Sequence, residues 1–172
     1  MNDQDSADVK GLRLVAHPLR LRLLSLLTGR TMSAAAAARE LGETQANVSY
    51  HIRRLAEGGL LELVDEVAIR GGIAKRYTHN SDSGEALTDS DRESFLGLMQ
   101  ALAYQLTARA PLYRENTTFA FTDAHVSIPA EEWPRVQGLA RELGRVIHEL
   151  AERPAGDRAV SASLTVAAFE TA

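Results

Sequence analysis

The residues from 33 to 61 constrain the fold most, because they predict two short helices joined by a tight turn. Ser33 can cap the first helix, and Gly42 stands where a left-handed residue would close it. Thr44 can cap the second helix, which a glycine pair at its far end would terminate. A short helix, a glycine turn and a second helix with polar side chains near its start predict a helix-turn-helix, the unit that presents a helix to the major groove of DNA.

The second helix, from Thr44 to Glu57, has two faces. Val48, Ile52 and Leu55 recur at helical spacing and predict a buried stripe. Amides on the other face can bridge an adenine edge, hydroxyls can bond bases or phosphates, and arginines further along can hold the DNA backbone. For His51 the pattern allows a phosphate contact or a cap on a neighbouring loop. The predicted DNA-contacting residues of this helix are Thr44, Gln45, Asn47, Ser49, Tyr50, His51, Arg53 and Arg54.

A predicted hairpin follows the second helix at once. Residues 60–64 indicate a strand and residues 73–79 its return, with the turn-forming run Arg70-Gly71-Gly72 between them. The tip and the returning strand are basic through Arg70, Lys75 and Arg76, which are further predicted DNA contacts. A helix-turn-helix followed by such a hairpin predicts a winged helix whose wing touches the DNA backbone. Without base-reading contacts, the same fold could serve as a protein-interaction module, and this alternative stays open.

Three stretches resemble the ArsR-type winged-helix repressors: HPLRLRLLSLL at 17–27, TQANVSYHIRRL at 44–55 and GLL at 59–61. The resemblance covers roughly residues 10–80. It implies a homodimeric bacterial transcription regulator, most simply a repressor, that binds a partly palindromic double-stranded DNA operator. The chain holds no cysteine, so the metal-binding motif of the founding arsenic and cadmium sensors is absent and no cofactor is expected. The resemblance therefore implies the fold and DNA binding but not metal sensing.

Charge is distributed unevenly along the chain. The formal net charge is −4, yet residues 10–80 carry 11 Lys and Arg against 6 Asp and Glu, whereas residues 81–172 carry 8 against 14. A basic half that contains the predicted reading helix and an acidic remainder fit a DNA reader with a second module. The first residues are acidic and polar, no apolar run is long enough to span a membrane, and cysteine is absent, so we expect a cytoplasmic protein.

Ahead of the helix-turn-helix, residues 9–16 predict a short helix and Pro18 the first turn of another, with His17 as its cap. Beyond the wing, residues 80–84 read as a polar linker. Thr88 or Ser90 then opens a long helix that Pro111 ends. Its apolar stripe predicts a dimer interface, with packing inside one chain as the alternative. The predicted interface residues are Phe95, Leu98, Met99, Leu102 and Leu106.

The remaining residues predict a strand-helix-strand module. Residues 119–128 alternate enough for a strand, residues 129–152 predict a helix with Pro129 and acidic side chains at its start, and residues 160–169 alternate as a half-buried strand. The module could dimerise, bind a small-molecule effector, or do both. The predicted fold class is thus mainly α with a small β component (α+β), with a DNA-binding domain over residues 1–80 and a C-terminal module over residues 81–172.

Metal binding and catalysis are weaker hypotheses. Asp123 and His125 on a strand could join His148 and Glu152, one helical turn apart, as zinc ligands, but exposed side chains of these types are common. No metal site is therefore assigned. The sequence holds no phosphate-binding glycine loop, no dinucleotide fingerprint and no zinc-protease motif, so an enzyme is not expected.

Overall fold

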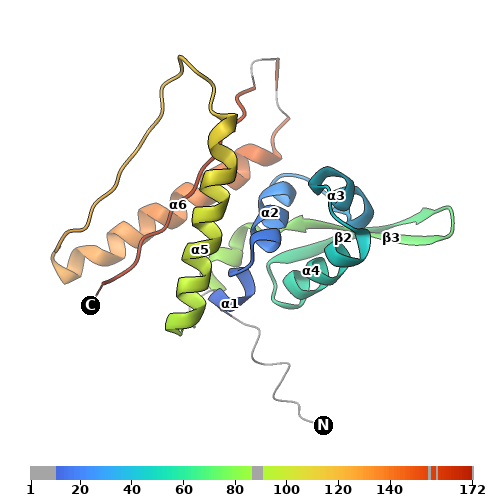
Figure 1. Ribbon diagram of the computed structural model, residues 1–172, viewed down its shortest axis with the longest axis horizontal. Coiled ribbons are helices and arrows are strands. Elements are labelled where there is room, and N and C mark those ends of the chain that lie inside the picture. The colour runs from blue at the N-terminus through green and yellow to red at the C-terminus, as the bar shows by residue number, and fades with distance from the viewer. Residues whose placement is uncertain (1–10, 87–90, 155, 158, 172) are drawn as a thin grey trace, which may run out of the picture.

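A computed structural model describes residues 11–86, 91–154, 156–157 and 159–171 of the chain. The fold is α+β: helices surround a small antiparallel sheet that extends into a long hairpin (Figure 1). Val9, Thr88 and Ser90, which enter the predicted helix starts, lie outside the described residues. The winged helix predicted from the sequence is confirmed.

Capping side chains, a proline and a glycine set the ends of the first helices. His17 caps α2, since its Nδ1 accepts a hydrogen bond from the Leu19 amide at 3.2 Å, and Pro18 occupies the first turn. Ser33 accepts from the Ala36 amide at 3.3 Å, and Gly42 closes the same helix in the left-handed conformation, with φ 67°. The bounds of these helices are α1 Leu12–Val15, α2 Pro18–Leu27, α3 Ala34–Leu41 and α4 Gln45–Glu57.

The sheet has the strand order β1-β3-β2 and is antiparallel throughout. Its strands are β1 Met32–Ser33, β2 Leu61–Ile69 and β3 Gly72–His79. The register pairs Leu61 with His79 and Ile69 with Gly72, with an irregularity between Leu63 and Asp65. The hairpin turns at Arg70 and Gly71, where φ is 101°, a value that favours glycine. Both strands of the predicted wing are confirmed, and β2 is longer than predicted.

One hydrophobic core lies among α1, α2, α3, α4 and the base of the sheet. The predicted stripe of α4 is buried there, together with apolar side chains from α1, α2 and the start of β2. The largest fully buried side chains are Leu14, Leu23, Leu27, Val48, Ile52, Leu55 and Leu60. Burial of this many leucine-sized side chains, at roughly 1.5–3 kcal/mol each, is the main force that holds α4 in place.

The long helix α5, Arg92–Arg109, packs on α1 and α2. Asp91 caps it by accepting a hydrogen bond from the Ser94 amide at 2.7 Å. Ala101 and Gln105 are buried against the N-terminal helices, and Gln105 Nε2 donates to the Pro18 carbonyl at 3.1 Å. The predicted polar linker at 80–84 is a 3-10 helix over Ser81–Ala86 instead, since Asn80 Oδ1 accepts from the Asp82 amide. The segment is therefore folded against the wing's base rather than extended.

The C-terminal region holds one helix between two extended stretches. The predicted helix is confirmed as a 3-10 turn, Ala130–Glu132, that leads into α6, Trp133–Glu152. The predicted strands at 119–128 and 160–169 are wrong as strands of one chain, because neither pairs with any described segment. Their residues are extended, but a strand requires a hydrogen-bonded neighbour, and the described part of the chain offers none.

The end of α6 meets the base of the wing. His148 Nε2 lies 3.0 Å from His79 Nδ1, and the His79 ring also contacts the Thr28 and Ser83 hydroxyls. Gly29 faces Ala151 so closely that an added Cβ would stand 2.3 Å from the Ala151 carbonyl oxygen. These contacts join α6 to the winged helix through its C-terminal end.

Candidate nucleic-acid interface

Helix α4 carries the candidate reading surface on the side opposite its buried stripe. Thr44 caps the helix by accepting a hydrogen bond from the Asn47 amide at 3.3 Å, so the first turn is fixed where bases would be met. Ser49 and Arg54 are half-buried at the margins of this surface. The predicted contacts that are exposed are Thr44, Gln45, Asn47, Tyr50 and Arg53. A polar, exposed first turn on a rigidly packed helix is the geometry of a major-groove reader.

An ion pair behind this surface orients one of the amides. Arg22 of α2 donates from Nη1 to Glu43 at 3.1 Å and from Nη2 to the Leu41 carbonyl at 2.7 Å. The other oxygen of Glu43 accepts from Asn47 Nδ2 at 3.3 Å. The Asn47 amide is thereby held with one N–H engaged, which leaves its oxygen and second N–H for a base edge. Sequence reasoning missed Arg22 and Glu43; the only signal was an acidic side chain directly before a reading helix.

His51 corrects the predicted contact set. Its side chain is buried, with 6% exposed, and its ring packs 4.4 Å from that of His17. Burial, followed by the charges of His17 and Arg20, lowers the pKa of His51. Because positions 48, 51, 52 and 55 lie on one helical face, His51 belongs to the stripe that faces the core. The residue supports α4 from inside and is not placed to contact phosphate.

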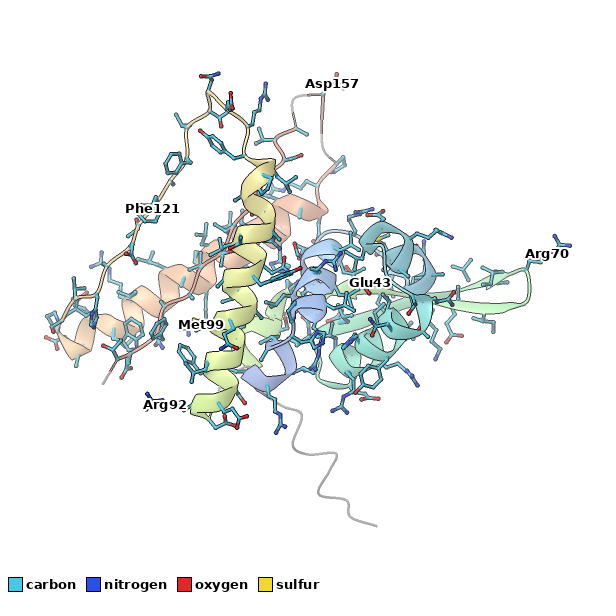
Figure 2. All side chains as sticks on the ribbon, viewed as in Figure 1. Glu43, Arg70, Arg92, Met99, Phe121 and Asp157 are labelled. Atoms are coloured by element: carbon cyan, nitrogen blue, oxygen red, sulfur yellow. The ribbon has the colours of Figure 1, made fainter. Side chains whose placement is uncertain are left out.

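The wing is less basic than its Lys and Arg residues alone predicted. Arg76 pairs with Asp65 across the hairpin through hydrogen bonds of 2.7 and 2.5 Å, and this contact lowers the pKa of the Asp65 carboxyl. Lys75 Nζ lies 3.4 Å from Glu66. Arg70 stands at the outer end of the hairpin (Figure 2), and the described residues offer it no carboxylate. Of the three predicted wing contacts, Arg70 is therefore the charge most available to a phosphate.

The residues of α5 that were predicted to form a dimer stripe do not share one environment. Leu98 packs on the winged-helix core of its own chain, and the Phe95 ring lies 4.8 Å from that of Phe169. Met99 and Leu102 are half-buried, and Leu106 is exposed. The face that α5 turns toward α1 and α2 carries Leu98 together with the buried Ser94, Ala101 and Gln105, three residues that the sequence analysis did not single out.

The candidate zinc ligands are not brought together. His148 faces His79 at the base of the wing, whereas His125 contacts the hydroxyl of Thr171. Within the described residues, no three His, Asp or Glu side chains are grouped as a metal site would need. The reason is that residues 119–128 do not pair as a strand beside α6, which the hypothesis required.

Comparisons with known proteins find similarity over the part of the chain that carries this interface. Residues 15–64 match a family of helix-turn-helix domains, a span that covers α2, α3, α4 and the first part of β2. A solved structure, a possible transcriptional regulator from Methanosarcina mazei Go1, is similar with 17% sequence identity, covering 67% of this chain and 91% of that one at a TM-score of 0.38. No curated protein matches the chain. In the part of the chain that the structure describes, no helix is long and apolar enough to cross a membrane.

Proposed function

We propose that this chain is a sequence-specific double-stranded-DNA-binding transcription regulator, an ArsR-like repressor that acts as a homodimer. The observation that carries the proposal is the exposed first turn of α4, where the Arg22–Glu43 pair holds the Asn47 amide ready for a base edge. Holding a side chain in its bound geometry before binding lowers the entropy cost of reading a base. The helix-turn-helix match over residues 15–64 supports the same function.

In this proposal each copy inserts α4 into a major groove, and two half-sites lie about one helical turn apart. Gln45 and Asn47 read bases, whereas Arg53, Arg54 and the wing's Arg70 hold phosphates. Residues 1–80 bind DNA and residues 81–172 join the copies, with the α5 stripe as one part of the contact. A small-molecule effector would act by changing the spacing of the two α4 helices, since a ligand shifts a two-state dimer through its different affinities for the two states.

The experiment begins with selection of duplexes from a random-sequence library by the purified protein. Fluorescence anisotropy then compares a selected duplex with a scrambled one across a salt series. We expect Asn47→Ala to relax preference at one or two base pairs, at about 1–3 kcal/mol each. Arg54→Ala should weaken binding to both duplexes alike and reduce the salt slope by about one. Arg145→Ala, an exposed arginine change on α6, is the control and should leave both affinities unchanged.

One observation favours a second candidate, a winged helix that docks on another protein. Ile69 and Ile73 flank the wing tip with more than half of each side chain exposed, and Val64 is exposed on the same hairpin. Exposed apolar side chains are typical of a protein contact. If the library yields no preferred sequence, and Asn47→Ala changes nothing, the DNA proposal fails and the wing's apolar surface becomes the interface to examine.

A further inference from the structure

Two stretches of the C-terminal region are extended and unpaired; we call residues 119–128 the first arm and residues 160–169 the second arm. Among the described residues, neither arm donates or accepts a main-chain hydrogen bond. Figure 1 shows the chain leaving the end of α5 and swinging away from the helices before it reaches α6, and Figure 2 places Phe121 on this outstretched part. A run of unpaired N–H and C=O groups in extended chain is the edge of a strand without its neighbour.

The side chains of the arms are those of strands rather than of solvated linkers. Phenylalanine, valine and threonine, which favour strands, recur in both arms, and neither arm contains glycine. The second arm has no ionisable side chain, and the first has only Asp123 and His125. Phe121 is 79% exposed and Val160 is 87% exposed. Long edges of this kind, mostly apolar and with little charge, readily pair with another strand.

Helix α6, which connects the arms, has an apolar face that is also uncovered. Four of its aliphatic side chains recur at helical spacing and are exposed: Val136, Leu139, Leu143 and Leu150. An amphipathic helix is stable when this face packs on a sheet or another helix. Two arms and one helix per chain are thus the parts of a two-layer unit whose sheet layer is not assembled within one chain.

The second arm is positioned to receive a partner. The Phe169 ring packs edge-on against Phe95 of α5, and the Thr171 hydroxyl lies 3.4 Å from His125 Nε2. These contacts fix the end of the second arm on its own chain while leaving its main-chain groups unpaired. The arm therefore offers an edge whose end is fixed on its own chain.

We infer that the partner of the arms is a second copy of this chain, which completes an intermolecular sheet covered by the α6 helices. Each copy brings the same unpaired edges, so a two-fold axis satisfies the arms of both at once, as in isologous dimers. The near absence of charge on the arms removes the repulsion that the acidic C-terminal half would otherwise impose. This inference rests on the proposed homodimeric regulator and assigns the contact that joins its two copies.

Proline substitution in the full chain tests the inference, because proline removes one main-chain donor. Thr122→Pro and Ala162→Pro lie within the arms, where a single chain uses neither donor. Thr118→Pro, in the same extended stretch but before the first arm, is the matched control. Val160→Lys adds a charge at the most exposed apolar arm position, which a monomer should tolerate. Sedimentation equilibrium without DNA gives the mass and the dimer dissociation constant, and circular dichroism checks that each variant is folded.

We expect the wild-type chain to sediment at the mass of two copies. The two arm prolines and Val160→Lys should each raise the dissociation constant about tenfold or more, which corresponds to about 1.4 kcal/mol, while Thr118→Pro leaves it unchanged. A single-chain mass at every concentration would overturn the inference and leave a different protein as the partner of the arms. A dimer that is insensitive to all three arm variants would overturn it as well. Anisotropy on the selected duplex separates this failure from that of the DNA-binding proposal, since it is measured independently on the wild-type protein.

Discussion

The winged helix with α5, residues 11–109, and the C-terminal region, residues 110–171, differ in what they bury. The first region contains every side chain that is buried in the described chain, from Leu14 to Gln105. The second region contains a helix and two extended arms but no buried side chain among its described residues. A chain keeps exposed apolar surface of this extent only where another surface covers it in use. This difference in burial accords with the inference above that association with a second copy completes the second region.

The largest expected effect is the loss of stability when a leucine is truncated, which should differ between the two regions. Leu55 is fully buried under α4, whereas Leu139 of α6 is 63% exposed. Leu55→Ala should lower the free energy of unfolding by about 2–5 kcal/mol, because it removes buried surface and leaves a cavity. Leu139→Ala in dilute protein should cost less than about 1 kcal/mol. Urea denaturation followed by circular dichroism measures both, and equal losses would break the comparison.

The contact between the two regions should respond to pH. Burial, followed by the charge of His148, lowers the pKa of His79 from 6.5 to about 4. The unfolded chain therefore takes up a proton at His79 near pH 6.5, whereas the folded chain resists it until about pH 4. Stability should be full above pH 6.5 and decline toward pH 4, by on the order of 3 kcal/mol in total.

His79→Gln provides the comparison for this prediction, because glutamine does not titrate. Urea denaturation at several pH values should give a flatter dependence of unfolding free energy on pH for His79→Gln than for the wild type. Parallel curves for the two proteins would show that His79 does not carry the effect.

Alanine substitution of one glycine in each region should give smaller changes in stability. A Cβ added at Gly58 would stand 2.0 Å from Leu14 Cδ2, whereas one added at Gly144 of α6 would meet nothing within 4 Å. Gly58→Ala should therefore destabilise the winged helix by about 1–3 kcal/mol through overpacking. Gly144→Ala should stabilise α6 by about 0.5–1 kcal/mol, because alanine favours helix. Thermal unfolding of the two variants should shift in opposite directions, and shifts of the same sign would contradict the account.

The smallest expected effects on stability are those of the surface ion pairs, and they should be similar in both regions. Arg76 pairs with Asp65 in the wing, and Arg145 pairs with Glu142 and Glu149 on α6. Arg76→Met and Arg145→Met should each leave the midpoint of urea denaturation close to that of the wild type, since exposed pairs are screened by solvent. A loss of stability for either variant as large as that of Leu55→Ala would mean that charge, rather than burial, distinguishes the regions.

Local signals explain what could be predicted from sequence. Caps at Ser33 and Thr44 and the left-handed Gly42 depend on a few neighbouring residues, so the pattern alone located α3 and α4 correctly. The arms could not be predicted correctly as strands of one chain, because alternation shows strand preference but does not say which edge will pair. Long-range contacts could not be predicted either. The His79–His148 contact joins residues far apart in sequence, and Arg22 reaches Glu43 from another helix.

The reading surface shows the same division between local and long-range information. Exposed positions on α4 follow from helical spacing, and Gln45, Asn47 and Arg53 lie on the outer face as predicted. His51 was misassigned because a histidine is polar enough to be expected outside, although its spacing from Val48 and Leu55 places it inside. The pairing of the wing's charges could not be predicted from the sequence, because it depends on the register of β2 and β3. That register places Arg76 opposite Asp65 and Lys75 opposite Glu66.

Hydrogen exchange of the full-length protein at low and high concentration tests the comparison most directly, because it reports both regions in one experiment. The amides of α4 should be protected at both concentrations. The amides of residues 119–128 and 160–169 should exchange freely in dilute protein and become protected in concentrated protein. Arms that stay unprotected at every concentration, beside a protected α4, would contradict the claim that a second copy completes the C-terminal region.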